Sequence, residues 1–252
     1  MIVTTEDSQV VLIDTAAARW RVPDEVNSDA MVQPSPPVAA GLVQQGEPIE
    51  LKAAPSPQTT IDVLVAYTPA LATRAGSTAG ALLRLDQLIA TSNQAYVDSE
   101  VAITLRLAHV LEVSFTESDD SGVALGNLTS GAGVLGPIQG TLRDRYGTDI
   151  VALVRPFNYP AQAGCGVGWV GGYGGSGAAI SSQSNNGFAV VSDGNDVNNS
   201  GYYCQNSAFA HELGYSMGAM HDRQTVTEGA IGGDATRTTA SQIEVYIAGL
   251  LH

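Results

Sequence analysis

Positive charge is scarce in this sequence. Its 11 Lys and Arg residues stand against 25 Asp and Glu, which gives a formal net charge of −14 at pH 7, and Lys52 is the single lysine. A nucleic-acid-binding surface needs Lys and Arg to neutralise phosphates, so this balance argues against a nucleic-acid partner. Charged residues reach only 14%, whereas about 25% is usual in a globular domain. The 44% of hydrophobic residues nevertheless excludes a disordered chain.

Long hydrophobic runs are also missing. No stretch approaches the roughly 20 consecutive apolar residues that cross a bilayer, so we expect no membrane insertion. The first residues carry Glu6 and Asp7 and lack the basic start of a secretory signal peptide. The chain enters a strand-like run at once, which favours a processed form or a fragment whose export signal has been removed.

Cysteine is rare, with only Cys165 and Cys204 in the chain. Both lie in the same region rich in Gly, Ser and Asn. An even number of cysteines favours one disulfide and an oxidising compartment. Two unpaired thiols are the alternative that the sequence leaves open.

Proline marks the division of the chain. At 252 residues the chain is longer than a usual single domain, which favours one large domain with a smaller segment beside it. Residues 33–58 hold six of the eleven prolines and are predicted to be a linker. Residues 1–32 then form a separate N-terminal segment, in which residues 9–13 and 20–22 can pair as a hairpin, and residues 59–252 form the main domain.

The main domain alternates strand and helix patterns. Residues 60–67 are a β-branched apolar run typical of a buried strand, and Ser77 can cap the helix that follows. This order predicts an α/β fold with a mostly parallel sheet. The later predicted elements are strands at 101–113, 149–155 and 188–192 and a short helix at 138–146.

A glycine-rich stretch occupies residues 164–187, with nine glycines in 24 residues. Its second half, residues 171–187, is predicted to be a flexible loop. Its first half contains Val167, Trp169 and Val170 among glycines, a pattern that favours an edge strand with an accessible backbone. Such an edge can accept an extended peptide.

The residues with the clearest chemical meaning follow position 207. Residues 208–219 are predicted to form a helix that ends near Gly218. On this helix His211 and Tyr215 stand four residues apart and therefore share one face, with Glu212 beside the first. A glycine turn that reverses the chain can bring His221 back to the same place.

This pattern resembles the zinc signature of metzincin peptidases, H-E-x-x-H-x-x-G-x-x-H, and the following Asp222 resembles the adamalysin or reprolysin branch. The resemblance extends to IDVLVAYTPA at residues 61–70, which looks like the opening strand of bacterial reprolysin-like peptidases. CGVGWVGG at residues 165–172 looks like the substrate-binding edge strand of the family. The implied fold is a twisted, mostly parallel metzincin-like sheet with a long zinc-site helix.

The resemblance also implies roles for these residues. His211 and His221 would be Zn²⁺ ligands with Tyr215 at the position of the remaining ligand, and Glu212 would be the general base. Protein or peptide substrates would lie antiparallel along the edge strand. Members of this branch are secreted, so a secreted or periplasmic location is expected. Residues 1–32 would be the remnant of a prosegment, and their lack of cysteine excludes a cysteine switch there. The expected substrate-binding residues are Gly166, Val167, Gly168, Trp169 and Val170.

The sequence departs from the family pattern in two ways. Tyr215 stands where the second histidine belongs, and no methionine follows His221 to form the usual methionine turn. Three interpretations of Tyr215 remain open. It is an oxygen ligand of an active or weakly active zinc site, or it marks a peptidase scaffold that has lost its function. In the third interpretation, the match to the zinc signature is a coincidence. We therefore keep two functions open. One is a zinc metalloendopeptidase in an active, impaired or inactive form, and the other is a non-catalytic peptide-binding module.

Overall fold

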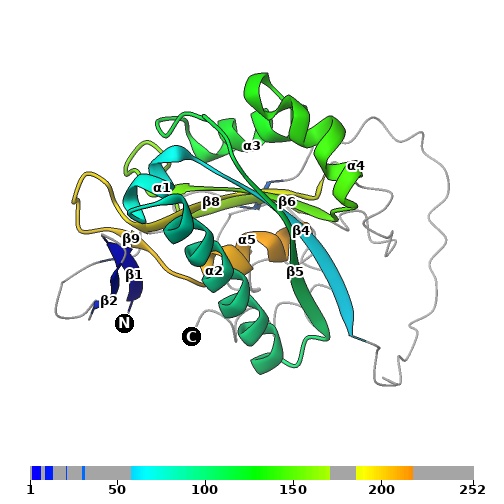
Figure 1. The fold of residues 1–252 in the computed structure, drawn as a ribbon, viewed down its shortest axis with the longest axis horizontal. Helices are drawn as coiled ribbons and strands as arrows, with labels where there is room; N and C mark the ends of the chain where they lie inside the picture. Colours follow the sequence, from blue (N-terminus) through cyan, green and yellow to red (C-terminus); the bar gives the residue numbers. More distant parts are fainter. Residues whose placement is uncertain are drawn as a thin grey trace, which may run out of the picture.

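The computed structural model describes residues 2–6, 9–13, 21, 30–31, 58–170 and 186–217 (Figure 1). A seven-stranded sheet runs through the main domain in the order β3-β7-β8-β6-β4-β5, with β9 paired to β8. A separate pair of antiparallel strands is formed by β1 (Ile2–Glu6) and β2 (Gln9–Ile13). The strands of the large sheet are β3 (Ala30–Met31), β4 (Thr59–Tyr67), β5 (Ile103–Glu112), β6 (Ile150–Pro156), β7 (Gly166–Trp169), β8 (Phe188–Asn195) and β9 (Tyr203–Cys204).

Strand direction changes near one edge of this sheet. The four strands β5, β4, β6 and β8 are parallel to one another, whereas β7 and β9 are antiparallel to β8. The short β3 is parallel to β7. The predicted α/β class with a mostly parallel sheet is confirmed.

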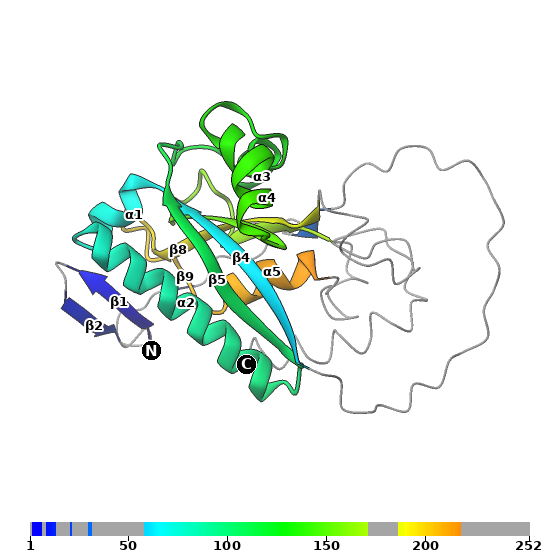
Figure 2. The same cartoon turned by 45° about the vertical axis from the view of Figure 1, so that its right-hand side comes forward.

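Helices cover both faces of the sheet, as Figures 1 and 2 show. One face carries α1 (Pro69–Arg74), α2 (Thr78–Asp98) and α5 (Ala208–Ser216), whose apolar residues form the first core with one set of strand residues. The other face carries α3 (Ser121–Ser130) and α4 (Arg143–Tyr146), and a second core lies beneath α3. Buried parallel strands are apolar on both sides for this reason.

Helix α2 begins where the sequence predicts. The Ser77 hydroxyl accepts a hydrogen bond from the Gly80 N–H at 3.0 Å and so caps the first turn. One stripe of the helix is buried, including Leu85 and Leu88. Helix α2 thus combines a capped start with an apolar stripe, the two patterns in a sequence that predict an amphipathic helix.

Other elements differ from the predictions. The hairpin partner of β2 is β1, whereas Arg21, the described residue of the predicted partner, forms a bridge with Tyr202. Helix α3 was not predicted, although the Asp120 carboxylate caps it and Gly131 ends it at a φ of +66°. The predicted helix at 138–146 is present, but its first part, η2 (Ile138–Leu142), is a π-helix that continues directly into α4. Of the predicted flexible loop, residues 171–185 lie outside the described residues.

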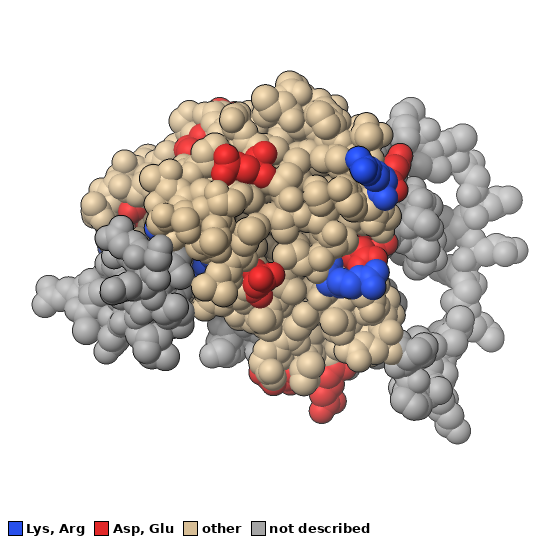
Figure 3. All heavy atoms as spheres, in the orientation of Figure 1, with Lys and Arg blue, Asp and Glu red and all other residues tan. Residues whose placement is uncertain are grey.

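Charged side chains are sparse on the visible surface. Figure 3 shows acidic and basic residues scattered over a mostly uncharged face of the described part. Among the helices of the described residues, none combines the length and the apolarity needed to cross a membrane.

Candidate active site

Helix α5 is buried along its whole length. All nine of its residues are buried, and the polar ones include His211 at 5%, Glu212 at 2% and Ser216 at 1% exposure. Burying a carboxylate or an imidazole is unfavourable unless other groups compensate for the lost water. A short helix with several buried polar side chains is therefore a candidate functional element.

His211 and Tyr215 meet on one face of α5. The Tyr215 hydroxyl lies 2.5 Å from His211 Nε2, and the two rings are nearly perpendicular with centroids 4.7 Å apart. Residues four apart in a helix lie one turn above each other, which explains the contact. The structure thus brings together the first two positions of the predicted metal site.

Glu212 packs against the glycines of β7. A Cβ atom added to Gly166 would lie 2.6 Å from Glu212 Cγ and 2.7 Å from Glu212 Cδ. A Cβ atom added to Gly168 would lie 2.5 Å from the Glu212 carbonyl oxygen. All three distances are far below van der Waals contact, so only glycine at these two positions allows α5 to come this close to the strand.

The residues of β7 that alternate with its glycines point to the other face of the sheet. Val167 and Trp169 belong to the second core, and Trp169 Nε1 donates a hydrogen bond to Thr129 Oγ1 of α3 at 2.6 Å. Val170, directly after the strand, is also buried. Of the five predicted substrate-binding residues, Gly166 and Gly168 therefore face α5, while the side chains of Val167 and Trp169 are used for packing.

A disulfide joins the two walls of this site. Cys165 directly precedes β7, and Cys204 is the last residue of β9, four positions before α5. Their Cα atoms are 5.2 Å apart at a sequence separation of 39, so the predicted disulfide is present. Closing a loop of this length stabilises the fold by about 4 kcal/mol in the chain-entropy model.

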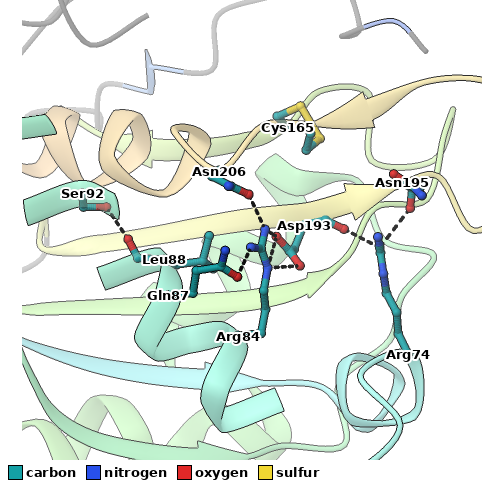
Figure 4. A network of polar contacts seen from close by, with 10 residues as sticks. Arg74, Arg84, Gln87, Leu88, Ser92, Cys165, Asp193, Asn195 and Asn206 are labelled. Carbon is teal, nitrogen blue, oxygen red and sulfur yellow. Dashed lines mark hydrogen bonds and ion pairs between the residues drawn. A yellow bond between two sulfur atoms is a disulfide. The ribbon is translucent and has the colours of Figure 1, made fainter. Parts of the chain in front are cut away.

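An ion pair buried beside α5 links it to α2. The Arg84 guanidinium of α2 contacts the Asp193 carboxylate of β8 at 2.6 Å and donates a hydrogen bond to Asn206 Oδ1 at 2.8 Å (Figure 4). Arg74 of α1 donates to the backbone carbonyls of Asp193 at 2.6 Å and Asn195 at 3.0 Å. Because Asn206 lies two residues before α5, this network connects the start of the helix to α2 and β8.

The electrostatics of the pair follow from its burial. Burial by itself raises the pKa of Asp193, but the charge and hydrogen bonds of Arg84, with a smaller effect of Arg74, hold that pKa below its ordinary value. Burial by itself lowers the pKa of Arg84, and Asp193 outweighs it, so that pKa is raised. Both groups therefore stay charged in the interior.

Sequence reasoning missed these supporting residues. Arg84 lies on the apolar stripe of α2 between Ala81 and Leu88, and a lone charge in such a stripe is the signal that predicts a buried partner. Tyr96, on the same stripe, donates from its hydroxyl to the Ala210 carbonyl of α5 at 3.3 Å. Burial raises the pKa of Tyr96, which keeps this donor protonated.

The donors on α5 can be compared with what a metal needs. Imidazole nitrogen and phenol oxygen are both possible zinc donors. Two zinc ligands in tetrahedral geometry are about 3.3 Å apart, whereas His211 Nε2 and the Tyr215 hydroxyl are at hydrogen-bonding distance, 2.5 Å. The two residues therefore fit zinc by their chemistry, whereas the 2.5 Å separation is that of a hydrogen bond and not of two ligands of one ion.

The third predicted ligand, His221, lies outside the described residues, as do Gly218 and Asp222. Within the part of the chain that the structure describes, no three His, Cys, Asp or Glu side chains converge on a metal-sized site. The described site therefore consists of His211, Glu212 and Tyr215 on α5, facing the glycine side of β7.

Known proteins are similar to most of this chain. The family model described as "Metallo-peptidase family M12B Reprolysin-like" matches residues 57–248. The peptidyl-Asp metalloendopeptidase of Pseudomonas aeruginosa is 32% identical over 176 residues, which cover 67% of this chain and 26% of that protein. The enzyme of the same name from Stenotrophomonas maltophilia strain R551-3 is 33% identical over 165 residues, which cover 65% of this chain and 34% of that protein.

The aligned region thus spans about a quarter to a third of the length of these curated relatives. A solved structure of a chaperone-substrate complex is similar over 65% of this chain and 24% of that chain, with 21% identity and a TM-score of 0.48. The family match covers most of the chain and includes every described element from β4 to α5. The chain therefore belongs to the reprolysin-like M12B metallopeptidases.

Proposed function

We propose that this chain is a zinc metalloendopeptidase with impaired metal binding, in which His211 and His221 are ligands and Tyr215 occupies the position of the remaining ligand. Glu212 is the general base. The observation that carries the proposal is the burial of His211, Glu212 and Tyr215 on one helix against the glycine face of β7. Family membership supports the reaction class.

The chemistry assigns a task to each group. Zinc, when bound, polarises a peptide carbonyl and lowers the pKa of water. The Glu212 carboxylate accepts the proton of the attacking water and passes it to the leaving amine. Gly166 and Gly168 of β7 lie against Glu212, which supports the assignment of β7 as the strand along which a substrate peptide would lie antiparallel.

Tyr215 lowers the metal affinity in this proposal. Its hydroxyl lies 2.5 Å from His211 Nε2, the nitrogen that faces it across one helical turn. Zinc binding requires that this hydrogen bond be broken, and histidine at position 215 would remove the competing hydroxyl and add an imidazole donor.

Three proteins test the role of Tyr215: the natural chain, Tyr215→His and Tyr215→Phe. Zinc affinity is measured by competition with a chromophoric chelator. We expect the histidine variant to bind zinc at least about 10-fold more tightly, and the phenylalanine variant to bind no more weakly than the natural chain. Weaker binding by the phenylalanine variant would show that the hydroxyl is a ligand and would overturn the competing role.

Glu212→Gln tests the general base in the Tyr215→His background. Removing a general base is expected to lower peptide cleavage by about 100-fold or more, while zinc affinity changes little. Glu100→Gln at an exposed position is the matched control. Because the relatives carry the name peptidyl-Asp metalloendopeptidase, peptides with a single Asp are the first substrates to assay. Unchanged cleavage in Glu212→Gln would refute the catalytic assignment.

The hydrogen bond between Tyr215 and His211 also favours the second candidate, a non-catalytic peptide-binding module. This module keeps the β7 edge and the helix but binds no metal. Peptide binding with neither zinc uptake nor cleavage in the natural chain and in Tyr215→His would identify it.

The remaining parts of the proposal concern organisation and location. Residues 1–32 are a prosegment remnant, residues 33–58 a linker and residues 59–252 the catalytic domain. The Cys165–Cys204 disulfide supports a secreted or periplasmic location, because such bonds persist in oxidising compartments. Thiol titration of the protein isolated from its natural source tests this, since two free thiols would contradict it.

A further inference from the structure

Strand β5 forms the edge of the large sheet on the side away from β7 and β3. The strand order ends with β5, and within the described residues only β4 pairs with it. At ten residues it is longer than the usual strand of about 5–6 residues. A long edge presents its outer N–H and C=O groups to any other strand, so folded proteins protect such edges.

The side chain of Asn93 covers this edge at one residue. The Leu105 N–H donates a hydrogen bond to Asn93 Oδ1 at 2.7 Å, and Asn93 Nδ2 donates to the Leu105 carbonyl at 2.9 Å. Asn93 belongs to α2, which runs beside β5 (Figure 2). An antiparallel neighbour would make the same two bonds to one residue of the strand. The amide therefore takes the place of a partner strand at Leu105.

The second half of β5 is irregular. Its pairing with β4 shifts between Val63 and Leu64, so that Ala108 has no partner in the register, which is a β-bulge. A bulge twists an edge strand and interrupts regular pairing. The regular part of the edge is therefore residues 103–107, and Leu105 lies at its centre.

This regular part is complementary to itself. Ile103, Leu105 and Leu107 pack in or against the first core, and Thr104 and Arg106 alternate with them. In an antiparallel pair of two such strands centred on Leu105, Ile103 of one copy lies opposite Leu107 of the other. Thr104 then lies opposite Arg106. Apolar side chains meet apolar ones, and twofold symmetry is the commonest symmetry of protein dimers.

We propose that the Asn93 side chain keeps β5 from pairing with the β5 strand of a second copy of this chain. The amide occupies the N–H and C=O of Leu105, where the twofold axis of such a pair would pass. Two strands cannot join there until both hydrogen bonds are broken in each copy. Because β5 lies at the other edge of the sheet from β7, this role of Asn93 does not depend on the proposed function.

Removing the amide makes pairing more favourable. Each hydrogen bond contributes a modest net free energy, and the two bonds of one copy together correspond to about a 10-fold change in an equilibrium constant. Both copies lose their bonds in a dimer, so Asn93→Ala is expected to strengthen dimerisation by about 100-fold. Alanine is a good helix former, which favours retention of α2.

Sedimentation equilibrium of the full chain measures this association at about 0.15 M salt, where repulsion between distant charges is screened. We expect dimers of Asn93→Ala at concentrations where the natural chain is monomeric. Asn93→Asp keeps the acceptor for the Leu105 N–H and adds a negative charge, so it should associate less than the alanine variant. Gln94→Ala is the matched control, because this exposed neighbour bonds only within α2, to Asp98 at 2.7 Å. Equal association of Gln94→Ala and Asn93→Ala would overturn the proposal.

Two further variants in the Asn93→Ala background test the pairing itself. Thr104→Glu places a carboxylate opposite Arg106 of the other copy and should tighten the dimer by about 5-fold, whereas Thr104→Lys places a like charge there and should weaken it. Non-specific association would follow the opposite order, because the net charge is −14 and lysine reduces the repulsion between copies. Tighter association of Thr104→Lys would therefore overturn the pairing through β5.

Hydrogen exchange of the Leu105 amide gives a local measurement. In dilute Asn93→Ala it should exchange about 10-fold faster than in the natural chain, and dimer formation at higher concentration should slow it again. Unchanged exchange in the dilute variant would show that Asn93 does not protect this edge. Faster exchange in a variant that stays as monomeric as the natural chain would also overturn the proposal. Should the alanine variant not fold, Asn93→Leu, an apolar side chain of similar size, replaces it in every comparison.

Discussion

Helices α2 and α5 pack on the same face of the sheet but bury their residues differently. Helix α2 is one-sided, with Leu85 and Leu88 buried and Leu83 and Val97 exposed at 56% and 61%. Helix α5 is buried on all sides and includes a histidine and a glutamate. The difference shows that α2 has the pattern of a scaffold helix, whereas α5 carries polar groups that packing alone does not require.

The largest loss of stability is expected from breaking the buried Arg84–Asp193 ion pair, which links the two helices. Arg84→Met leaves the Asp193 carboxylate buried without its main partner. We expect the free energy of unfolding to fall by about 3–5 kcal/mol, measured by urea denaturation. Arg106→Met is the matched control, because the Arg106 side chain is 67% exposed in its pair with Asp62 and the variant should behave nearly as the natural chain. Equal losses in the two variants would contradict the special role of the buried link.

The same link makes stability depend on pH. Because the pKa of Asp193 is lower in the folded state than the unfolded value of about 3.9, its contribution is complete above that value and is lost as the pH falls through the folded pKa. Asp193→Asn lacks this titration. Its free energy of unfolding should therefore fall less steeply below about pH 4 than that of the natural chain, and parallel curves would refute the assignment.

An intermediate effect is expected where α5 approaches β7. Gly168→Ala places a methyl group where the Glu212 carbonyl lies, so the helix must shift. We expect a loss of about 1–3 kcal/mol, as is usual for overpacking, and a lower melting temperature. Gly164→Ala is the matched control, because nothing lies within 4 Å of a Cβ atom there. An unshifted melting temperature in Gly168→Ala would show that the close approach is not required.

The smallest effect is expected on the exposed side of α2. Leu83→Ala removes an apolar side chain that is largely in water, and alanine is a good helix former. The free energy of unfolding should change by less than about 0.5 kcal/mol. A larger loss would mean that this face of α2 packs against another part of the protein, and the contrast with α5 would weaken.

Much of the fold was predictable because its signals are local. The apolar run of β4 and the Ser77 cap of α2 depend on neighbouring residues alone. Helix α3 was missed because glycine, serine and asparagine are weak helix formers, and its cap at Asp120 and packing on the sheet supply what propensity lacks. The partner of β2 was misassigned although β1 ends only three positions before it, because residues 2–6 were not weighed as the neighbouring strand.

The site was predicted in part for a related reason. The spacing of His211 and Tyr215 was sufficient to place them on one face of a helix. The role of Gly166 as a gap for Glu212 was not predictable, because a strand pattern does not say which element covers each face. The pairing of Met31 with β7 was also not predictable, because the two segments are separated by more than 130 residues.

The Cys165–Cys204 disulfide also affects how the molecule moves. It ties the start of β7 to the strand that leads into α5, so neither can open far without the other. Proteins open in cooperative units with their own free energies, and a covalent bond between two segments favours their opening as one. Amides of β7 and α5 should therefore show one common free energy of opening in hydrogen exchange while the bond is intact, and a thiol reductant should let the two free energies diverge.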